Sequence, residues 1–406
     1  MKTKVAMMFG GKSVEHEVSI ISGIQAIMSM DTDKYEVIPV YINKNNQMFI
    51  GEDVGKIESY KHIDELMAKS QRVILVNEEN KVSLVPYPQK RFGKKPEIEI
   101  DIAFPIVHGT NVEDGALQGY LKTIGIPFVG CDVTASAVGM DKYVSKAVLK
   151  DNGIPVLDCV CFTTSEYAEM DTLLDTVEKE IGYPAIVKPL NLGSSVGISV
   201  AKNRVELTKS IDDAFSYASK VIVEHAITKL REINCSVLGD ENDAIASECE
   251  EHLHTKDILS YEDKYLSNNS KNGGSKGMAS VSRKIPAELT PEKREEVREI
   301  AVKSFQKLGC NGVARIDFMI DEATGKVYAN EVFFQQAVPF PGTAFYQWVK
   351  DEGYLKTEDY SKWLNQDGYL DCLVNYPYAN AKEIEKLRDH LMSRYYFSFT
   401  YIFKTF

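Results

Sequence analysis

Residues 186–200 constrain the fold of this chain more than any other segment, and they read Ile-Val-Lys-Pro-Leu-Asn-Leu-Gly-Ser-Ser-Val-Gly-Ile-Ser-Val. Two apolar runs, the second with period-two alternation, flank a glycine-bounded loop, which predicts strand, loop and strand. The loop can approach a phosphate closely because glycine lacks a side chain, and the two serines and Lys188 supply donors and charge. A plain hairpin turn with an exposed lysine is the alternative. That alternative is favoured for an isolated motif, because short glycine motifs are weak signals.

The size and composition of the chain limit the class of protein. It has 406 residues, of which 44% are hydrophobic and 26% are charged, which suits two or three ordinary cores. No apolar run approaches the ~18 residues that a membrane-spanning helix needs. The apolar run after Met1 is also too short for a signal peptide. We therefore expect a multi-domain, cytoplasmic protein with no membrane partner.

The charge balance and the cysteines argue against two further kinds of function. The chain has 59 acidic and 47 basic side chains, hence a net charge of -12, which disfavours a nucleic-acid partner. The seven cysteines are scattered and contain no Cys-x-x-Cys spacing. We expect buried thiols rather than disulfides or a metal site.

The first 130 residues alternate strand and helix patterns. Residues 5–9 form a short apolar run, and a Gly-Gly-Lys-Ser turn at 10–13 leads into a helix that Ser13 can cap. Residues 35–42 and 102–107 read as further strands. This order predicts an open α/β sheet.

Polar residues follow two of these strands. Glu15, His16 and Glu17 fall in the first turn of the expected helix, where carboxylates can hold a positively charged substrate group. Complementation of the helix dipole explains them equally well. The segment 108–115, which reads His-Gly-Thr-Asn-Val-Glu-Asp-Gly, also lies between a strand and a helix, and ligands of open α/β sheets gather at such strand ends.

The middle of the chain has the pattern of a nucleotide site. Asp141 and Lys142 stand early in a helix that closes at Gly153, and a new domain begins near this point. Glu224 ends an apolar strand, and Glu232 follows after a short connector. Carboxylates suit this position because a purine amino group and ribose hydroxyls are hydrogen-bond donors.

Residues 256–284 are the least core-like segment. They are rich in Asn, Ser, Gly and Lys and carry Tyr261, Lys264 and Tyr265. We interpret the segment as a lid over an active site, because such lids are weakly packed loops. A solvated loop is the alternative that composition alone favours.

Residues 312–333 hold the strongest chemical signal. They read as a strand, a turn at 321–326 and a return strand, which predicts a hairpin. Period two places Arg315 and Asp317 on one face, and Glu331 on the return strand can approach them. Two carboxylates suit magnesium that also binds phosphate, and an adjacent arginine can stabilise negative charge. A structural salt bridge is the alternative.

Together, these motifs resemble the D-alanine:D-alanine ligase family in order and spacing over about residues 1–331. The matching segments are 10–19 (Gly-Gly-Lys-Ser-Val-Glu-His-Glu-Val-Ser), 108–115, 140–142 (Met-Asp-Lys), 187–189 (Val-Lys-Pro), 193–197, 261–265 (Tyr-Glu-Asp-Lys-Tyr) and 312–318 (Gly-Val-Ala-Arg-Ile-Asp-Phe). The resemblance implies an α/β protein with the ATP-grasp fold. It further implies an N-terminal open α/β domain that binds substrate, a small central α+β subdomain and a C-terminal α+β subdomain. The boundaries we expect are 1–130, 131–224 and 225–348, with 349–406 as an unassigned extension.

The resemblance also assigns roles to single residues. The ATP-binding residues would be Lys142, Lys188, Ser195, Val196, Glu224, Glu232 and Lys264. Glu15, Ser194 and Tyr265 would order the lid over the first substrate, while His108 and Arg315 would line the reacting groups. Asp317 and Glu331 would bind a pair of Mg²⁺ (or Mn²⁺) ions.

The implied activity is ATP-dependent ligation of two D-alanine molecules through an acyl phosphate, for peptidoglycan synthesis, by a homodimeric enzyme. The chain departs from the family at its second acidic strand, which normally reads Asn-Glu-Ile-Asn and here ends in Phe333. Phenylalanine offers no oxygen ligand, so either water replaces it or a displaced Gln335 or Gln336 supplies the oxygen. Two alternatives stay open, a catalytically weakened nucleotide-binding relative and a ligase with a changed acceptor.

Overall fold

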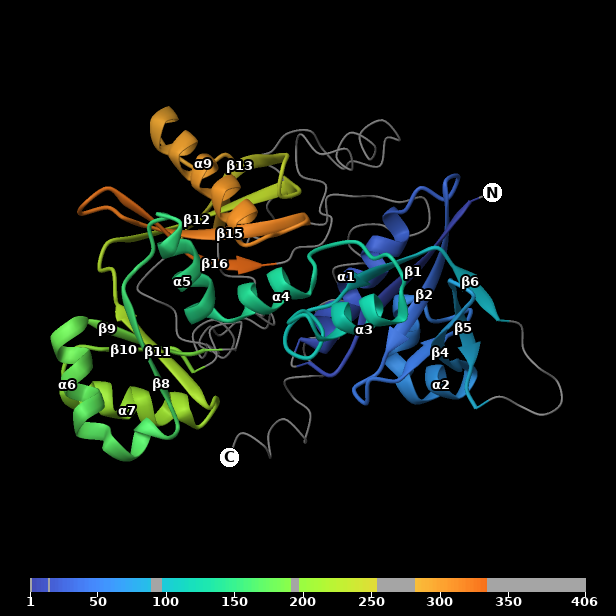
Figure 1. Cartoon of the computed structure of the whole chain (residues 1–406), viewed down its shortest axis with the longest axis horizontal. Helices are drawn as coiled ribbons and strands as arrows, with labels where there is room; N and C mark the ends of the chain where they lie inside the picture. Colours follow the sequence, from blue (N-terminus) through green and yellow to red (C-terminus); the bar gives the residue numbers. More distant parts are fainter. Residues whose placement is uncertain (1, 14, 89–96, 191–196, 254–281, 334–406) are drawn as a thin grey trace, which may run out of the picture. The chain divides into compact units, whose positions relative to one another are not determined.

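The computed structural model describes residues 2–13, 15–88, 97–190, 197–253 and 282–333 (Figure 1). The chain divides into two compact units, with described residues up to Ala137 in the first and from Val138 in the second. Five predicted site residues lie outside the described ranges: Ser194, Ser195, Val196, Lys264 and Tyr265. So do Gln335, Gln336 and the extension. Within the described ranges, no helix combines the length and apolarity that a bilayer crossing requires.

The first unit is built on a seven-stranded mixed sheet in the order β6-β5-β4-β3-β2-β1-β7. Its strands are β1 (Thr3–Gly10), β2 (Tyr35–Ile42), β3 (Met48–Ile50), β4 (Gln71–Glu78), β5 (Lys81–Pro86), β6 (Ile98–Ile100) and β7 (Ile102–Ile106). β1 pairs in parallel with β2 and β7, and the pairs from β2 to β6 are antiparallel. The prediction of an open α/β sheet is confirmed.

Helices cover both faces of this sheet. They are α1 (His16–Ser29), α2 (Ile63–Lys69), with the short helix η1 (Ile57–His62) before it, and α3 (Ala116–Ile124); α4 (Val133–Met140) follows. β1 is buried on both faces: Met8 packs with Leu121 of α3, and Phe9 packs with Ile20 of α1. This two-sided burial explains why β1 is apolar at successive positions rather than alternating.

The start of α1 differs from the prediction. The helix begins at His16, with Glu15 at its N-cap and no side-chain capping hydrogen bond. Ser13 Oγ instead accepts a hydrogen bond from the Glu15 backbone N–H at 3.1 Å, inside the turn that precedes the helix. Serine therefore stabilises the turn rather than the helix end, because short side chains also bond backbone groups two residues on.

The second unit contains a four-stranded antiparallel sheet in the order β10-β9-β11-β8. Its strands are β8 (Cys159–Thr163), β9 (Ala185–Pro189), β10 (Ser199–Ala201) and β11 (Lys220–His225), and its helices are α5 (Lys142–Asp151), η2 (Glu166–Glu169), α6 (Met170–Glu180) and α7 (Arg204–Phe215). β9 and β10 pair directly, so the strand–loop–strand prediction for 186–200 is confirmed. α7 begins at Arg204 because Asn203 caps it by accepting from the Glu206 N–H.

Period two gives this sheet two different faces. Val187 and Val223 point to the face that packs against α6 and α7, including Leu173 and Ile211. Lys188, displaced by one residue, belongs to the opposite face. The helices therefore cover one face and leave the lysine-bearing face for other elements.

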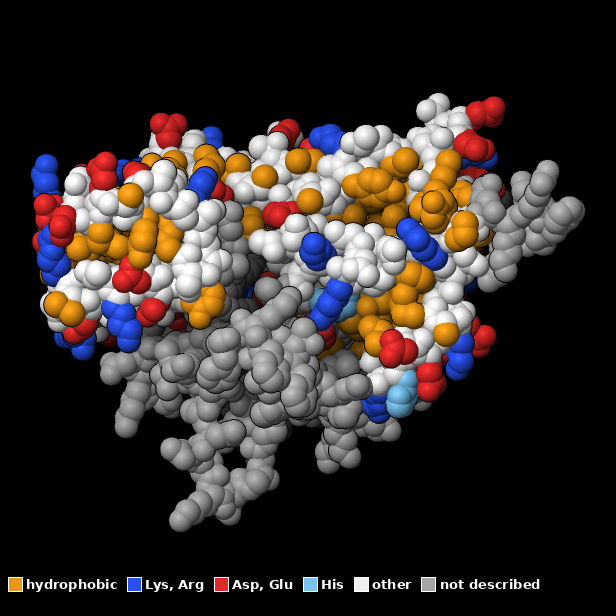
Figure 2. All heavy atoms as spheres, turned by 90° about the horizontal axis from the view of Figure 1, so that it is seen from below, with side chains coloured by type: hydrophobic (Ala, Val, Ile, Leu, Met, Phe, Trp, Pro, Cys, Tyr) orange, Lys and Arg blue, Asp and Glu red, His pale blue; other side chains and the backbone are white. Residues whose placement is uncertain are grey.

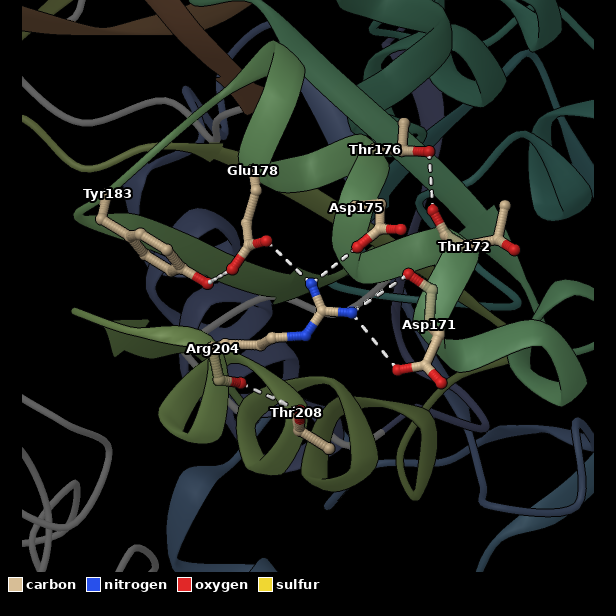
Figure 3. A network of polar contacts seen from close by, with 8 residues as sticks. All are labelled: Asp171, Thr172, Asp175, Thr176, Glu178, Tyr183, Arg204 and Thr208. Carbon is tan, nitrogen blue, oxygen red and sulfur yellow. Dashed lines mark hydrogen bonds and ion pairs between the residues drawn. The ribbon is translucent and has the colours of Figure 1, made fainter.

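An arginine joins the two helices at the surface (Figure 3). Arg204, at the start of α7, donates to the carboxylates of Asp175 and Glu178 at 2.7 Å and to that of Asp171 at 3.2 Å, all on α6. Glu178 also accepts from the Tyr183 hydroxyl at 2.8 Å. Because Arg204 is exposed, water and salt screen these ion pairs, and we assign the network no role in the site.

The second sheet of this unit has five antiparallel strands in the order β14-β13-β12-β15-β16. They are β12 (Leu230–Gly239), β13 (Ala244–Leu253), β14 (Ser282–Lys284), β15 (Gly312–Asp321) and β16 (Lys326–Phe333), and α9 (Pro291–Lys307) lies across one face (Figure 1). The predicted hairpin at 312–333 is confirmed. The predicted lid 256–284 extends too far, since its last three residues form β14 and pair with β13.

Packing beneath α9 yields a stability prediction. Phe305 is fully buried on α9 among the residues that the helix turns toward the sheet. Phe305→Ala should lower the free energy of unfolding of the second unit by about 3–5 kcal/mol, from lost transfer energy and a cavity. Val205→Ala, at a side chain that is 80% exposed, is the matched control. Chemical denaturation that gives equal midpoints for the two variants would contradict this account of the core.

Candidate functional site

The first unit brings Glu15 and the segment after His108 together. Glu15 follows β1, His108 follows β7, and these strands are parallel neighbours. A Cβ atom placed on Gly109 (φ +78°) would lie 2.8 Å from Glu15 Oε2 and 2.4 Å from Ser13 Oγ. A side chain at position 109 would thus displace the Glu15 carboxylate, which gives a physical reason for glycine there.

The neighbours of Glu15 have structural contacts instead. His16 is buried, and its ring nitrogens lie 2.6 Å from the Gly11 carbonyl oxygen and 3.0 Å from the Tyr41 hydroxyl. Burial lowers the pKa of His16. Glu17 accepts a hydrogen bond from Lys44 Nζ at 2.7 Å. His16 and Glu17 are therefore both held by contacts within the first unit.

His108 has the environment of a neutral imidazole. Its Nε2 lies 3.4 Å from Ser22 Oγ, and burial lowers the pKa of His108 to about 4. The ring therefore carries no charge near neutral pH and can take part only in neutral hydrogen bonds. The next backbone N–H, that of Gly109, donates to Glu113 at 2.8 Å. This bond holds the turn after β7 in place.

The second unit gathers predicted ATP-binding residues around α5. Asp141 caps the helix by accepting from two backbone N–H groups, which confirms the predicted helix start. Lys142 Nζ lies 3.0 Å from Glu331 of β16, and Lys146 Nζ lies 2.8 Å from Glu224 of β11. Residues four apart lie on the same face of a helix. From successive turns of α5, Lys142 therefore pairs with a carboxylate of the five-stranded sheet and Lys146 with one of the four-stranded sheet.

Glu224 forms ion pairs with two lysines, Lys146 and Lys188. Its Oε2 accepts a hydrogen bond from Lys188 Nζ at 2.6 Å, while its Oε1 lies beside Lys146. Burial alone would raise the pKa of Glu224, but the two ammonium groups outweigh it and lower that pKa to about 2. Burial would likewise lower the pKa of Lys188, and Glu224, then Glu331 and Glu232, raise it overall. Glu224 and Lys188 are therefore held in their charged forms.

The loop between β9 and β10 is outside the described residues except for its last glycine. Gly197 adopts φ +70°, and a Cβ there would lie 2.8 Å from Pro189 Cγ and 2.9 Å from the Tyr217 ring. Both the backbone conformation and the lack of space require glycine at this position. Gly197 thus lies close to Pro189, the last residue of β9 and the neighbour of Lys188.

The five-stranded sheet presents a row of polar residues on the face opposite α9. Asp317 of β15 lies directly across from Asn234 of β12 and Glu331 of β16. Directly opposed residues point to the same face. Arg315, two residues before Asp317, donates from Nε and Nη2 to the Asp317 oxygens at 2.5 and 2.8 Å. The predicted grouping of Arg315, Asp317 and Glu331 is confirmed as geometry.

Electrostatics distinguish the groups of this row. Burial raises the pKa of Asp317 to about 6 despite the opposing effect of Arg315, and Glu331 and Glu232 add to the rise. Burial would lower the pKa of Arg315, but Asp317 raises it above its usual value. Burial, together with the neighbouring carboxylates, thus outweighs the effect of Arg315 on Asp317. A cation beside these carboxylates would oppose this rise in pKa.

The donor set fits a magnesium ion that is shared with phosphates. Within the described ranges, no cluster of three or more His, Cys, Asp or Glu side chains has the arrangement of a metal cage. Mg²⁺ bound with a nucleotide typically takes only one or two carboxylates, and Asp317 and Glu331 face each other across neighbouring strands. These two residues therefore suit the ion in type and number.

Three residues near the predicted site were missed by sequence analysis: Glu113, Lys146 and Asn234. Lys146 follows Lys142 by one helical turn, and both are buried on α5. A pair of lysines at that spacing normally indicates an exposed face, so the signal was misleading. Asn234 stands two residues after Glu232, and period two could have placed it on the same face.

Known proteins show which family these residues belong to. Family sequence models described as D-ala D-ala ligase N-terminus and D-ala D-ala ligase C-terminus match residues 4–131 and 148–342, the second extending past residue 331 where the motifs end. The D-alanine–D-alanine ligase of Caldicellulosiruptor bescii is 40% identical to this chain, over 82% of this chain and 86% of the relative. The D-alanine–D-alanine ligase of Acetivibrio thermocellus is 38% identical, over 82% of this chain and 87% of the relative.

Solved structures give the same result for the fold. The VanG D-Ala:D-Ser ligase from Enterococcus faecalis superposes with a TM-score of 0.68 at 25% identity, covering 97% of this chain and 100% of that one. The D-alanine-D-alanine ligase from Coxiella burnetii gives 0.66 at 25% identity, covering 100% and 99%. The predicted ATP-grasp fold is confirmed, and this chain belongs to the D-alanine–D-alanine ligase family.

Proposed function

We propose that this protein is a D-alanine:D-alanine ligase, which joins two D-alanine molecules at the expense of ATP and releases ADP and phosphate for peptidoglycan synthesis. The observation that carries the proposal is the convergence of Lys142 and Lys188 with the Asp317–Glu331 pair inside a chain of this family. Triphosphate and metal need this combination of ammonium groups and carboxylates.

The chemistry follows from charge. The carboxylate of the first D-alanine attacks the γ-phosphorus of ATP, and the bond to the ADP oxygen breaks, which leaves an acyl phosphate. The amine of the second D-alanine attacks the acyl carbon, loses a proton and expels phosphate. Both partners of the first step are anions, so Lys188 and Arg315 are assigned to offset their charge. Glu15 is assigned to the ammonium of the first D-alanine and His108, as a neutral donor, to its carboxylate.

Asp317 and Glu331 are the residues we assign to magnesium. Held there, Mg²⁺ would neutralise part of the negative charge of the phosphates. Glu224 and Glu232 are assigned to the base and ribose, as acceptors of their N–H and O–H groups. Ser194, Ser195, Val196, Lys264 and Tyr265 keep their proposed roles from the family resemblance.

The broader assignments are also proposals. The first unit would be the substrate domain, and the two sheets of the second unit would be ATP-grasp subdomains that divide near residue 224. We propose a cytoplasmic homodimer without a nucleic-acid partner. On the face that Figure 2 shows, Lys and Arg side chains are scattered among Asp and Glu rather than gathered into a basic surface, and the net charge is -12.

A coupled assay of ADP release, with and without D-alanine, tests the function. D-alanine-dependent release together with formation of the dipeptide supports the proposal. ATP binding without turnover would support the hypothesis of a catalytically weakened relative, which Phe333 suggests. Turnover only with D-serine or D-lactate as second substrate would show a changed acceptor, a possibility that the likeness to a D-Ala:D-Ser ligase makes worth including.

The residue Phe333 allows a separate prediction about magnesium. β16 keeps its pairing through Phe333, whose backbone lies opposite Arg315, and this favours a water molecule in place of the missing amide ligand. Phe333→Asn should therefore lower the magnesium concentration at half-maximal activity. Gln335→Ala and Gln336→Ala serve as controls and should leave it unchanged. A magnesium titration with no gain for Phe333→Asn and a strong loss for either glutamine variant would reverse this assignment.

A further inference from the structure

Glu224 is shared by two buried lysines, but the two contacts differ in kind. Lys188 Nζ makes a hydrogen bond of 2.6 Å to Oε2. Lys146 Nζ lies 2.8 Å from Oε1, yet neither that nitrogen nor that oxygen forms an aligned hydrogen bond within the described part of the chain. Lys146 is thus an ion-pair partner of Glu224, in a geometry less aligned than that of the Lys188 hydrogen bond.

Counted by itself, the triad of Lys146, Lys188 and Glu224 carries one positive charge in excess, and Glu331 and Glu232 act on Lys188 from the five-stranded sheet. The side chains of the triad are only 3%, 8% and 1% exposed, so water does little to screen this charge. The other groups near Glu224 are on the adjacent strands. Cys159 of β8 is opposite Glu224, and burial, followed by the Glu224 charge, raises the pKa of that thiol. Cys159 is therefore neutral and does not alter the balance.

We propose that Lys146 is a positioning residue for ATP, which shares the carboxylate of Glu224 and so leaves the charge of Lys188 available to the nucleotide phosphates. Without Lys146, a single carboxylate would neutralise a single lysine, and the excess charge would vanish. This inference rests on the proposed ATP-dependent function and goes beyond it, because no motif assigns Lys146 a role. Lys142, one turn earlier, is already paired with Glu331 and does not replace it.

The first test is ATP binding by calorimetry on the full-length chain. Lys146→Met keeps the length of the side chain without its charge, and it should weaken ATP binding about tenfold to a hundredfold. Lys146→Arg should restore affinity to within a few-fold, since the guanidinium keeps the charge. Lys150→Met, one further turn along α5 at an exposed lysine paired with Asp158, should bind like wild type.

A double-mutant cycle separates this role from simple loss of packing. If Lys146 acts through Glu224, Lys146→Met should cost much less affinity in a Glu224→Gln background, where no carboxylate remains to neutralise Lys188. Turnover at saturating ATP should also fall less than affinity does, because Lys146 acts on nucleotide binding. A thermal unfolding scan of each variant identifies losses that come from misfolding. The Arg variant keeps the proposal testable if the Met variant does not fold.

The outcomes are distinct. Wild-type affinity for Lys146→Met, or equal losses in the two backgrounds, would overturn the inference while leaving the proposed function intact. Equal losses would mean that Lys146 contacts the nucleotide or the fold independently of Glu224. Failure of Lys146→Arg to recover affinity in a folded protein would also overturn it. Wild-type protein that binds no ATP at all would overturn the proposed function itself, and this inference with it.

Discussion

Lys188→Ala is expected to lower kcat/KM for ATP by about a thousandfold, since a buried charged donor to a phosphoryl group contributes on this scale. Lys188 is 8% exposed on the face of the four-stranded sheet opposite α6 and α7, and it precedes Pro189, which lies close to Gly197. A charge in such surroundings interacts with phosphates far more strongly than one in water. The variant should still fold, because Glu224 keeps Lys146 as its partner. Equilibrium binding of ATP and single-turnover ADP formation are the measurements.

Two comparisons sharpen that experiment. Lys188→Arg retains the charge and should lose less than Lys188→Ala, although its planar group differs from a compact ammonium. Lys220→Ala, on the same sheet at an exposed position, should behave like wild type. If purified Lys188→Ala kept wild-type turnover and ATP affinity, the assignment of the glycine loop to phosphate binding would be wrong.

Arg315→Ala should reduce kcat by about a hundredfold to a thousandfold, the cost typical of a donor that meets charge in the transition state. Arg315 is placed for this role by its two hydrogen bonds to Asp317, and it sits in the row that includes Glu331. ATP affinity should change much less than kcat, because the charge that Arg315 offsets grows during phosphoryl transfer. Steady-state rates with D-alanine and direct ATP binding separate the two effects.

A second variant separates a loss of catalysis in Arg315→Ala from a loss of stability. Loss of the guanidinium leaves Asp317 without its partner in a partly buried position, so Arg315→Ala can also destabilise the sheet. Arg315→Lys keeps the charge but loses the bidentate hydrogen bond to Asp317. We expect this variant to keep most of its stability but to lose much of its activity. A folded Arg315→Lys variant with full kcat would show that any positive charge suffices. A folded Arg315→Ala variant with full kcat would remove Arg315 from the reaction.

The hairpins and their charged residues were readable in the sequence because they depend on local patterns. The alternation of residues 312–333 fixes which side chains share a face, and Arg315 and Asp317 are neighbours on that face whatever else the chain does. The same holds for β9, where Lys188 follows the buried Val187 by one residue. Strand, turn and facing charges therefore needed no knowledge of distant contacts.

The motifs added what local patterns could not. No single segment distinguished a phosphate loop from a hairpin turn, but several motifs in a fixed order over 331 residues specified one family, and the family match then established the fold. The helix starts were less certain, since short polar side chains at Ser13 and Asn203 can serve a turn or a cap.

Only the tertiary structure decided which charges meet. Lys146 precedes Glu224 by 78 positions, and no local spacing identifies the two as partners. The fold nevertheless places Lys146 Nζ 2.8 Å from the Glu224 carboxylate. Likewise, the register of β12 against β15, rather than any motif, sets Asn234 across from Asp317. Burial, charge and pKa at these positions come from segments that are remote in sequence, because a side chain's partners are set by how sheets and helices pack.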